Sequence, residues 1–298
     1  MRTKVPPVRL KERLIEWVMM LCSFVTVLTT IGIILVLALE SITFFSEVSI
    51  IDFLTDTQWT PLFSEKHFGI LPLLSGTLLT TTIAILLAVP LGLIIAIYLN
   101  EYAPQKFTAV VKPILEVLAS VPTVVYGFFA LQFVTPLLQT FIPDLRGFNA
   151  LSPGLVMGIM IIPYITSLSE DALRSVPNSL REASYGMGAT KFQTAFKVMV
   201  PAASSGIIVA IILAISRALG ETMIVAIAAG QEPKLTFNPK ESVETITTYI
   251  VQVSMGDVPQ DSLEYRTIFA AGLTLFVFTF ILNNISFWIR RKFQNKYE

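Results

Sequence analysis

Two charged residues interrupt an otherwise uncharged apolar stretch in the second half of the chain. Between positions 201 and 230, Arg217 and Glu221 are the only ionisable residues. A guanidinium offers a planar fork of hydrogen-bond donors that matches an oxyanion, so Arg217 could meet an anion while Glu221 tunes the charge. A spacing of four residues also lets the two side chains pair on one helix face. A structural ion pair that only fixes helix packing is therefore the alternative to an anion site.

Other residue types that carry chemistry are scarce. The chain has one cysteine, Cys22, and one histidine, His67, which excludes a disulfide framework, a multi-cysteine metal site and a paired-histidine zinc motif. No Gly-Lys dipeptide occurs, so the chain lacks a Walker A phosphate-binding loop. We therefore expect no catalytic residue, no metal and no cofactor, and a membrane-embedded enzyme is the least favoured class.

A second group of residues at informative spacing lies about two thirds of the way along the chain. Pro177 suits the first turn of a helix, and Gly188 can supply the left-handed residue that ends it. Thr190 and Gln193 have the spacing of a capping box, which begins a further short helix. The sequence thus predicts a helix, a glycine turn and a helix over about 176–200.

The elements that must position these residues are membrane spans. Hydrophobic residues make up 54% of the 298 residues and charged residues 14%, with a mean hydropathy of +0.71. Such a chain is a membrane protein in contact with lipid, and its zero net charge gives no reason to expect nucleic acid. Crossing about 30 Å of hydrocarbon takes about 20 helical residues. Six stretches qualify: 17–39, 68–100 (diving at Ser75 after turns along the outer interface), 117–143, 147–169, 201–230 and 267–289.

Basic residues orient these six spans. Fifteen Lys and Arg residues fall on the side that carries both termini, against five on the other side, so both termini are expected in the cytoplasm. We expect a cytoplasmic basic N-terminus (1–16), a six-span domain (17–290) and a cytoplasmic tail (291–298). The outer loops, 40–67 and 232–266, carry eleven acidic residues and are long enough to meet an external partner.

Small and polar residues inside the spans have structural or functional interpretations. Thr77 and Thr81 are four residues apart and could line an anion path, although threonines in membrane helices usually bond to their own backbone. Gly154 and Gly158 have the spacing of close helix packing, which we prefer to a role in binding a ligand.

The segment around Gly188 resembles the EAA signature of ABC importer permeases. The matching residues are Glu182-Ala183-Ser184, then Gly188, then Val198-x-Val200-Pro201, with serine in place of the second alanine. In that family the two helices dock on the ATPase subunit, so the resemblance assigns ATPase coupling to Glu182, Ala183 and Gly188. The alternative is an interfacial amphipathic helix pair without a special role.

Four further segments narrow the resemblance to phosphate-specific ABC permeases. Residues 217–223 look like the RALGET segment of that family, and similar segments occur at 76–81, at 88–92 together with 98–104, and at 120–127. The likeness covers roughly residues 70–290, and Met223 with the basic N-terminus favours the PstC-type subunit over its PstA-type partner.

This resemblance implies an all-α membrane protein with the six-helix, MetI-like fold of type I importers, located in the plasma membrane. It implies a second permease of the PstA type, two ATPase subunits, an external phosphate-binding protein, and phosphate as the substrate. It also implies a substrate path that includes Arg217 and Glu221. The rival functions are a permease for another oxyanion, such as sulfate or molybdate, and a self-contained anion channel.

Overall fold

The computed structural model describes residues 10–294, so most of the expected basic N-terminus and part of the expected tail lie outside the described residues. Within 10–294 the chain is helical, and its β-type pairings are two isolated bridges, Trp59 with Phe68 and Gly230 with Val243. This confirms the all-α class. Five helices of the described chain are long and apolar enough to cross a membrane, and a bent pair brings the number to as many as six.

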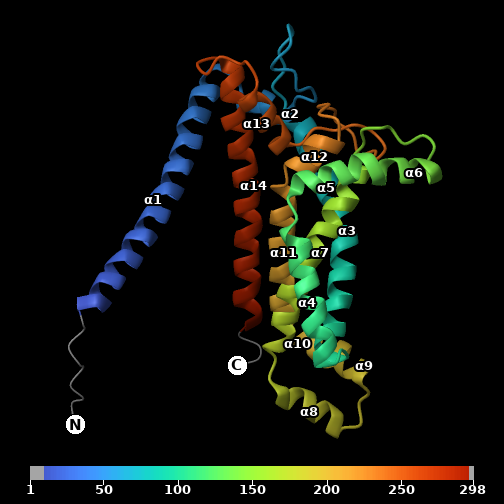
Figure 1. The fold of residues 1–298 in the computed structure, drawn as a ribbon. Coiled ribbons are helices and arrows are strands. Elements are labelled where there is room, and N and C mark those ends of the chain that lie inside the picture. Colours follow the sequence, from blue (N-terminus) through green and yellow to red (C-terminus); the bar gives the residue numbers. More distant parts are fainter. Residues whose placement is uncertain (1–9, 295–298) are drawn as a thin grey trace.

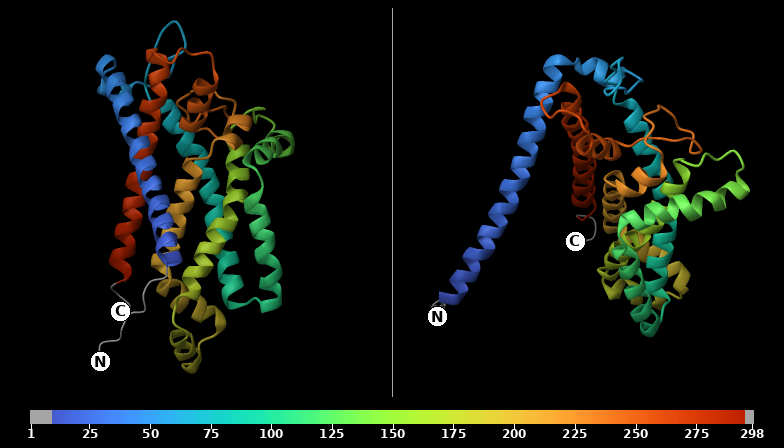
Figure 2. Two further views of the ribbon diagram at one scale, coloured as in Figure 1. Left: turned by 60° about the vertical axis from the view of Figure 1, so that its left-hand side comes forward. Right: turned by 45° about the horizontal axis from the view of Figure 1, so that its top comes forward.

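The longer helices extend along a common direction (Figures 1 and 2). They are α1 (Leu10–Glu47), α3 (Leu71–Glu101), α4 (Gln105–Ser120), α7 (Leu151–Arg174), α11 (Ser204–Leu219) and α14 (Leu263–Gln294). Shorter helices are α2 (Ile50–Thr55), α5 (Thr123–Phe129), α6 (Thr135–Phe141), α8 (Asn178–Gly186), α9 (Lys191–Thr194), α10 (Val200–Ala202), α12 (Met223–Ala228) and α13 (Ile246–Met255). Two π-helical segments, η1 (Ala130–Val134) and η2 (Ala195–Met199), complete the order. Helix α1 meets α14 and diverges from the remaining bundle (Figure 1).

The most extensive contact between two helices of the described bundle is that of α3 with α7. A Cβ on Gly154 would lie 2.8 Å from the side chain of Ile83, and one on Gly158 would lie 2.9 Å from the backbone oxygen of Ala84. Such short separations require residues without a Cβ at these points, so the expectation of close packing at Gly154 and Gly158 is confirmed. The resulting core places α7, which leads into the α8 segment, directly against α3.

The second span differs from the expected one at its outer end. Helix α3 is continuous from Leu71, and the expected change of direction at Ser75 is absent. Ile70 and Leu73 are instead fully buried in a cluster with the aromatic side chains of Trp59 and Tyr249. Burial of these apolar groups against the outer segments removes the reason for the chain to lie along the interface.

The third span also has different bounds from those expected, 117–143. Helix α4 runs beside α7 and ends at Ser120, whereas the segment from α5 to α6 turns across the bundle (Figures 1 and 2). Val121 precedes Pro122 and is extended, with φ −61° and ψ 130°, because the proline ring disfavours helical geometry in the preceding residue. Residues 123–141 qualify as a span by length and composition, whereas α4 does not, although in the fold α4 follows the direction of the long helices and residues 123–141 run across it.

The fifth span is broken at both ends. The helical segment Lys191–Ala202 and α11 meet at an angle of 71°. At the other end α11 stops at Leu219, and α12 begins separately at Met223. The prediction of one continuous helix over 201–230 is therefore wrong. The second break, between α11 and α12, falls within the RALGET-like segment.

Candidate functional site

The helix, turn and helix expected over 176–200 are present. Helix α8 ends in a Schellman motif: the Gly188 N–H donates to the Tyr185 carbonyl at 2.9 Å, and the Ala189 N–H donates to the Ser184 carbonyl at 3.2 Å. Gly188 has φ +82°, the left-handed conformation that glycine adopts without steric cost. Thr190 and Gln193 form the expected capping box at the start of α9. The backbone of this segment is thus set by the residues that predicted it.

Helix α8 presents two distinct faces at the end of the bundle opposite α2, α12 and α13 (Figure 1). Glu182 and Ala183 are exposed, as a docking role requires. Ser184 is buried, and its hydroxyl is hydrogen-bonded to that of Thr194 at 2.9 Å. The serine that replaces the second alanine of the EAA signature therefore ties α8 to α9, a contact that the sequence pattern did not indicate.

The structure separates Arg217 from Glu221. Arg217 is exposed in the last turn of α11, and no ion pair or hydrogen bond of the described residues includes it. Glu221 lies beyond the break at Gly220, is 5% exposed, and its carboxylate accepts the backbone N–H of Met223 at 3.2 Å. The ion pair that the four-residue spacing allowed is not formed, because the helix ends before it reaches Glu221.

Glu221 belongs to a small polar network that joins the break to the outer helices. Its backbone oxygen accepts the hydroxyl of Thr247 at 2.8 Å, and the neighbouring Ile246 N–H donates to the hydroxyl of Thr77 at 3.1 Å. The Thr77 hydroxyl also donates to the Leu73 carbonyl at 2.7 Å. Thr77 is therefore buried and holds α13 against α3, and its expected place on the substrate path stays a prediction.

Thr81, one turn further along α3, is 5% exposed, and its hydroxyl has no hydrogen-bond partner among the described residues. A buried hydroxyl without a partner is unusual, because desolvation then costs free energy that no bond offsets. Its expected place on the substrate path stays a prediction.

A buried carboxyl lies beside the same end of α3. A Cβ on Gly76 would lie 2.2 Å from the backbone oxygen of Glu244, so only glycine lets the loop before α13 approach α3 this closely. Glu244 is 2% exposed, and its Oε1 has no hydrogen-bond partner among the described residues. Burial raises the pKa of Glu244 from about 4.5 to about 8, so the carboxyl is mainly neutral at pH 7.

The raised pKa of Glu244 predicts a pH-dependent stability. Neutral Glu244 contributes stability that is complete below pH 4.5 and is lost as the pH rises towards 8. The reason is that the Glu244 carboxyl loses its proton at a lower pH in the unfolded chain than in the folded one. Glu244→Gln keeps the shape and stays neutral, so its melting temperature should increasingly exceed that of the wild type between pH 5 and pH 8. Thermal unfolding of the purified protein in detergent measures this difference. Glu232→Gln, on the exposed part of the same loop, is the control, and parallel curves for wild type and Glu244→Gln would contradict the prediction.

Two further buried carboxylates at the opposite end of the bundle were not predicted. Glu170 is 1% exposed and pairs with Lys112 of α4 and Arg174 of α7, each at 2.8 Å. The side chain of Glu101, at the end of α3, is 2% exposed and pairs with Arg181 of α8 at 2.7 Å. The four-residue spacing of Glu170 and Arg174 was a local signal, whereas Glu101 and Arg181 are 80 residues apart and only the fold joins them.

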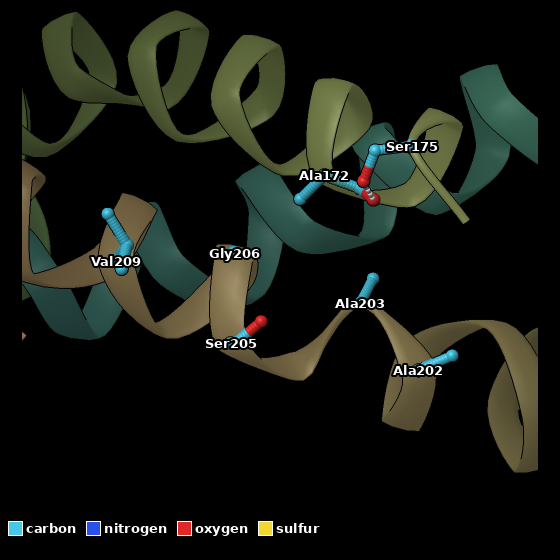
Figure 3. Close-up of a pocket in the computed structure, with 7 residues that line it drawn as sticks. All are labelled: Ala172, Ser175, Ala202, Ala203, Ser205, Gly206 and Val209. Atoms are coloured by element: carbon cyan, nitrogen blue, oxygen red, sulfur yellow. Dashed lines mark hydrogen bonds between the residues drawn. The ribbon is translucent and has the colours of Figure 1, made fainter. Parts of the chain in front are cut away.

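A small cavity of about 230 Å³ lies at the bend between α10 and α11 (Figure 3). Small side chains line it, among them Ala172 of α7 and Ser175 just after it, with Ala203, Ser205 and Gly206 on the other side. Its lining carries no charged group, so the cavity offers no cation to an anionic ligand.

Comparisons with known proteins agree with this architecture. The family described as "Binding-protein-dependent transport system inner membrane component" matches residues 88–296. The "Probable ABC transporter permease protein YqgH" of Bacillus subtilis is 37% identical over 262 residues, which cover 87% of this chain and 84% of that protein. The "Phosphate transport system permease protein PstC" of Mesorhizobium japonicum is 36% identical, with 77% of this chain and 75% of that protein covered.

Solved structures show the same fold at low sequence identity. A chain of a bacterial alginate ABC transporter has a TM-score of 0.62 at 16% identity, and the match covers 95% of this chain and 96% of that one. A chain of the MetNI methionine ABC transporter has a TM-score of 0.57 at 18% identity, with 73% and 93% covered. Because the family match and the relatives each extend over most of the sequence, the chain belongs to the binding-protein-dependent transport system inner membrane components, as a PstC-type ABC transporter permease.

Proposed function

We propose that this chain, with a second permease of the PstA type, forms the path by which an ATP-driven importer moves inorganic phosphate across the cell membrane. Two ATPase subunits supply the energy, and an external phosphate-binding protein delivers the substrate. The similar proteins named as phosphate transport permeases support the choice of substrate. Membership of a multi-pass permease family supports the membrane location and the general set of partners.

The observation that carries the proposal is the uncompensated charge of Arg217. A cation within a membrane span costs about 2.5–3.5 kcal/mol on insertion scales, so it is retained where a function requires it. No acidic side chain among the described residues lies within 4.0 Å of its guanidinium. The C-terminal dipole of α11 offsets part of the cost, and the five donors of the guanidinium remain free for an oxyanion.

The depth of Arg217 fits an anion path. Arg217 lies thirteen residues after the first residue of α11, about 20 Å along the helix axis at 1.5 Å per residue. With α8 proposed at the cytoplasmic end, this distance supports a position of the guanidinium beyond the midplane of a 30 Å bilayer core, towards the side that receives substrate. Glu221 lies past the helix break and forms no ion pair with Arg217. Its negative charge nearby weakens the attraction between Arg217 and a bound anion.

Phosphate uptake in cells that lack this chain tests the function. Restoring the chain should restore uptake of radiolabelled phosphate, and excess sulfate or molybdate should compete weakly. Strong competition by either anion would indicate the rival oxyanion permease. Uptake that persists with a hydrolysis-deficient ATPase subunit would indicate a self-contained channel.

Orientation gives a separate prediction. In a Cys22→Ala background, Lys191→Cys should react with a membrane-impermeant thiol reagent only after the membrane is opened. Phe237→Cys, which replaces a 72% exposed side chain in the loop after α12, should react in intact cells. Labelling in intact cells measures both, and external reactivity at position 191 would overturn the orientation together with the coupling role of α8.

A further inference from the structure

Helix α8 has an inner face with two polar anchors. Arg181 and Ser184 are three residues apart and lie on the side of α8 opposite to the exposed Glu182 and Ala183. Ser184 bonds to Thr194 and so holds α8 to the segment that follows it. Arg181 reaches in the other direction, to the cytoplasmic end of α3.

The Arg181 anchor is a buried, directional contact. Its Nη2 donates to Oε1 of Glu101 at 2.7 Å, and the Asn100 amide donates to the same oxygen at 2.8 Å. The Glu101 side chain is 2% exposed, whereas that of Arg181 is 26% exposed. Removing Arg181 would leave the carboxylate with only the Asn100 amide as a donor, and an unpaired buried charge is strongly unfavourable.

Helix α3 connects this anchor to the opposite end of the molecule. Its 31 residues form one continuous helix of about 46 Å, with Pro90 inside it. At the outer end of α3, the hydroxyl of Thr77 holds the start of α13, and the adjacent Thr247 bonds to the backbone of Glu221. A displacement of α8 that moves α3 therefore reaches the helix break next to Arg217.

From this arrangement we propose that Arg181 and Glu101 are positioning residues that transmit movement of the docking helix α8 to α3, and so couple ATP hydrolysis to substrate release. The proposal rests on the proposed function, in which two ATPase subunits drive import, and takes α8 as the helix that docks on them. The Arg181–Glu101 ion pair holds α8 to α3, while the exposed residues of α8 contact the ATPase.

The test uses the complete transporter reconstituted in liposomes with its external binding protein. Arg181→Gln and Glu101→Gln should lower the phosphate imported per ATP hydrolysed by about tenfold. The charge-swapped double variant, Arg181→Glu with Glu101→Arg, should recover most of the ratio. Arg174→Gln is the matched control, because it removes an arginine from the same end of the bundle while Glu170 keeps its contact with Lys112.

The ratio separates coupling from assembly, because loss of complex lowers both uptake and hydrolysis. The proposal would be overturned if Arg181→Gln imported as much phosphate per ATP hydrolysed as the wild type. It would also be overturned if the charge-swapped double variant were no better than the single variants in this ratio or in assembly. The rate of amide hydrogen exchange over residues 178–186 reports on the Arg181–Glu101 contact and does not depend on the substrate. This rate should rise about tenfold in Arg181→Gln but not in Arg174→Gln. A wild-type complex that imports no phosphate would instead refute the proposed function, while the exchange result would still decide whether the anchor exists.

Discussion

Arg217→Lys is expected to lower phosphate uptake by about ten- to a hundredfold in a transporter that still assembles. Lysine keeps the positive charge but replaces a planar fork of donors with a single ammonium, so bidentate contact with an oxyanion is lost. A hydrogen bond to a charged group contributes about 1.5–3 kcal/mol, which corresponds to this loss of rate. Arg217 is exposed and has no ion pair among the described residues, so the substitution leaves no buried charge without its partner within the chain.

Uptake is measured together with the yield of assembled complex. Arg174→Lys is the matched control, because a lysine there can still pair with Glu170 at an exposed position of α7. The double variant Arg217→Gln with Glu221→Gln should remain inactive, since the two side chains do not pair in the fold. Transport by that double variant at the wild-type rate would show that Arg217 does not bind the anion.

Gly188→Val is expected to uncouple the transporter, so that ATP hydrolysis no longer drives uptake although the chain still inserts. Gly188 has φ +82°, where an L-residue costs about 1–2 kcal/mol and a β-branched residue more. No heavy atom lies within 4 Å of the position its Cβ would take, so the effect comes from the backbone and not from a clash. Relief of that strain rotates α8 relative to α9 and misplaces Glu182.

Two substitutions make the Gly188 result specific. Gly186→Val adds the same side chain at the last residue of α8, where space is open and φ is not positive, and it should retain coupling. Gly188→Asn should retain part of it, because asparagine tolerates the left-handed conformation. Phosphate uptake and ATP hydrolysis are measured in liposomes, and normal uptake by Gly188→Val would remove the case for the docking turn.

The sequence by itself determined the features that depend on a few neighbouring residues. The transfer free energy of an apolar run fixes where most spans lie, and the glycine conformation at Gly188 and the capping box at Thr190 fix the turn between α8 and α9. The spacing of Gly154 and Gly158 indicated that their helix packs closely against a neighbour, and the fold identified that neighbour as α3. The EAA-like residues around Gly188 and the segments that resemble phosphate permeases could likewise be identified from the sequence alone.

Only the tertiary structure decided which polar groups meet. Arg217 and Glu221 suited a helical pair by spacing, but the break at Gly220 lets Glu221 cap α12 and leaves the guanidinium free. Glu101 and Arg181 gave no sign of pairing, because 80 residues separate them and their contact exists only once α8 has packed beneath α3. Capping and membrane insertion are settled by local free energies, whereas a buried ion pair depends on how distant helices are brought together, which no short stretch of sequence encodes.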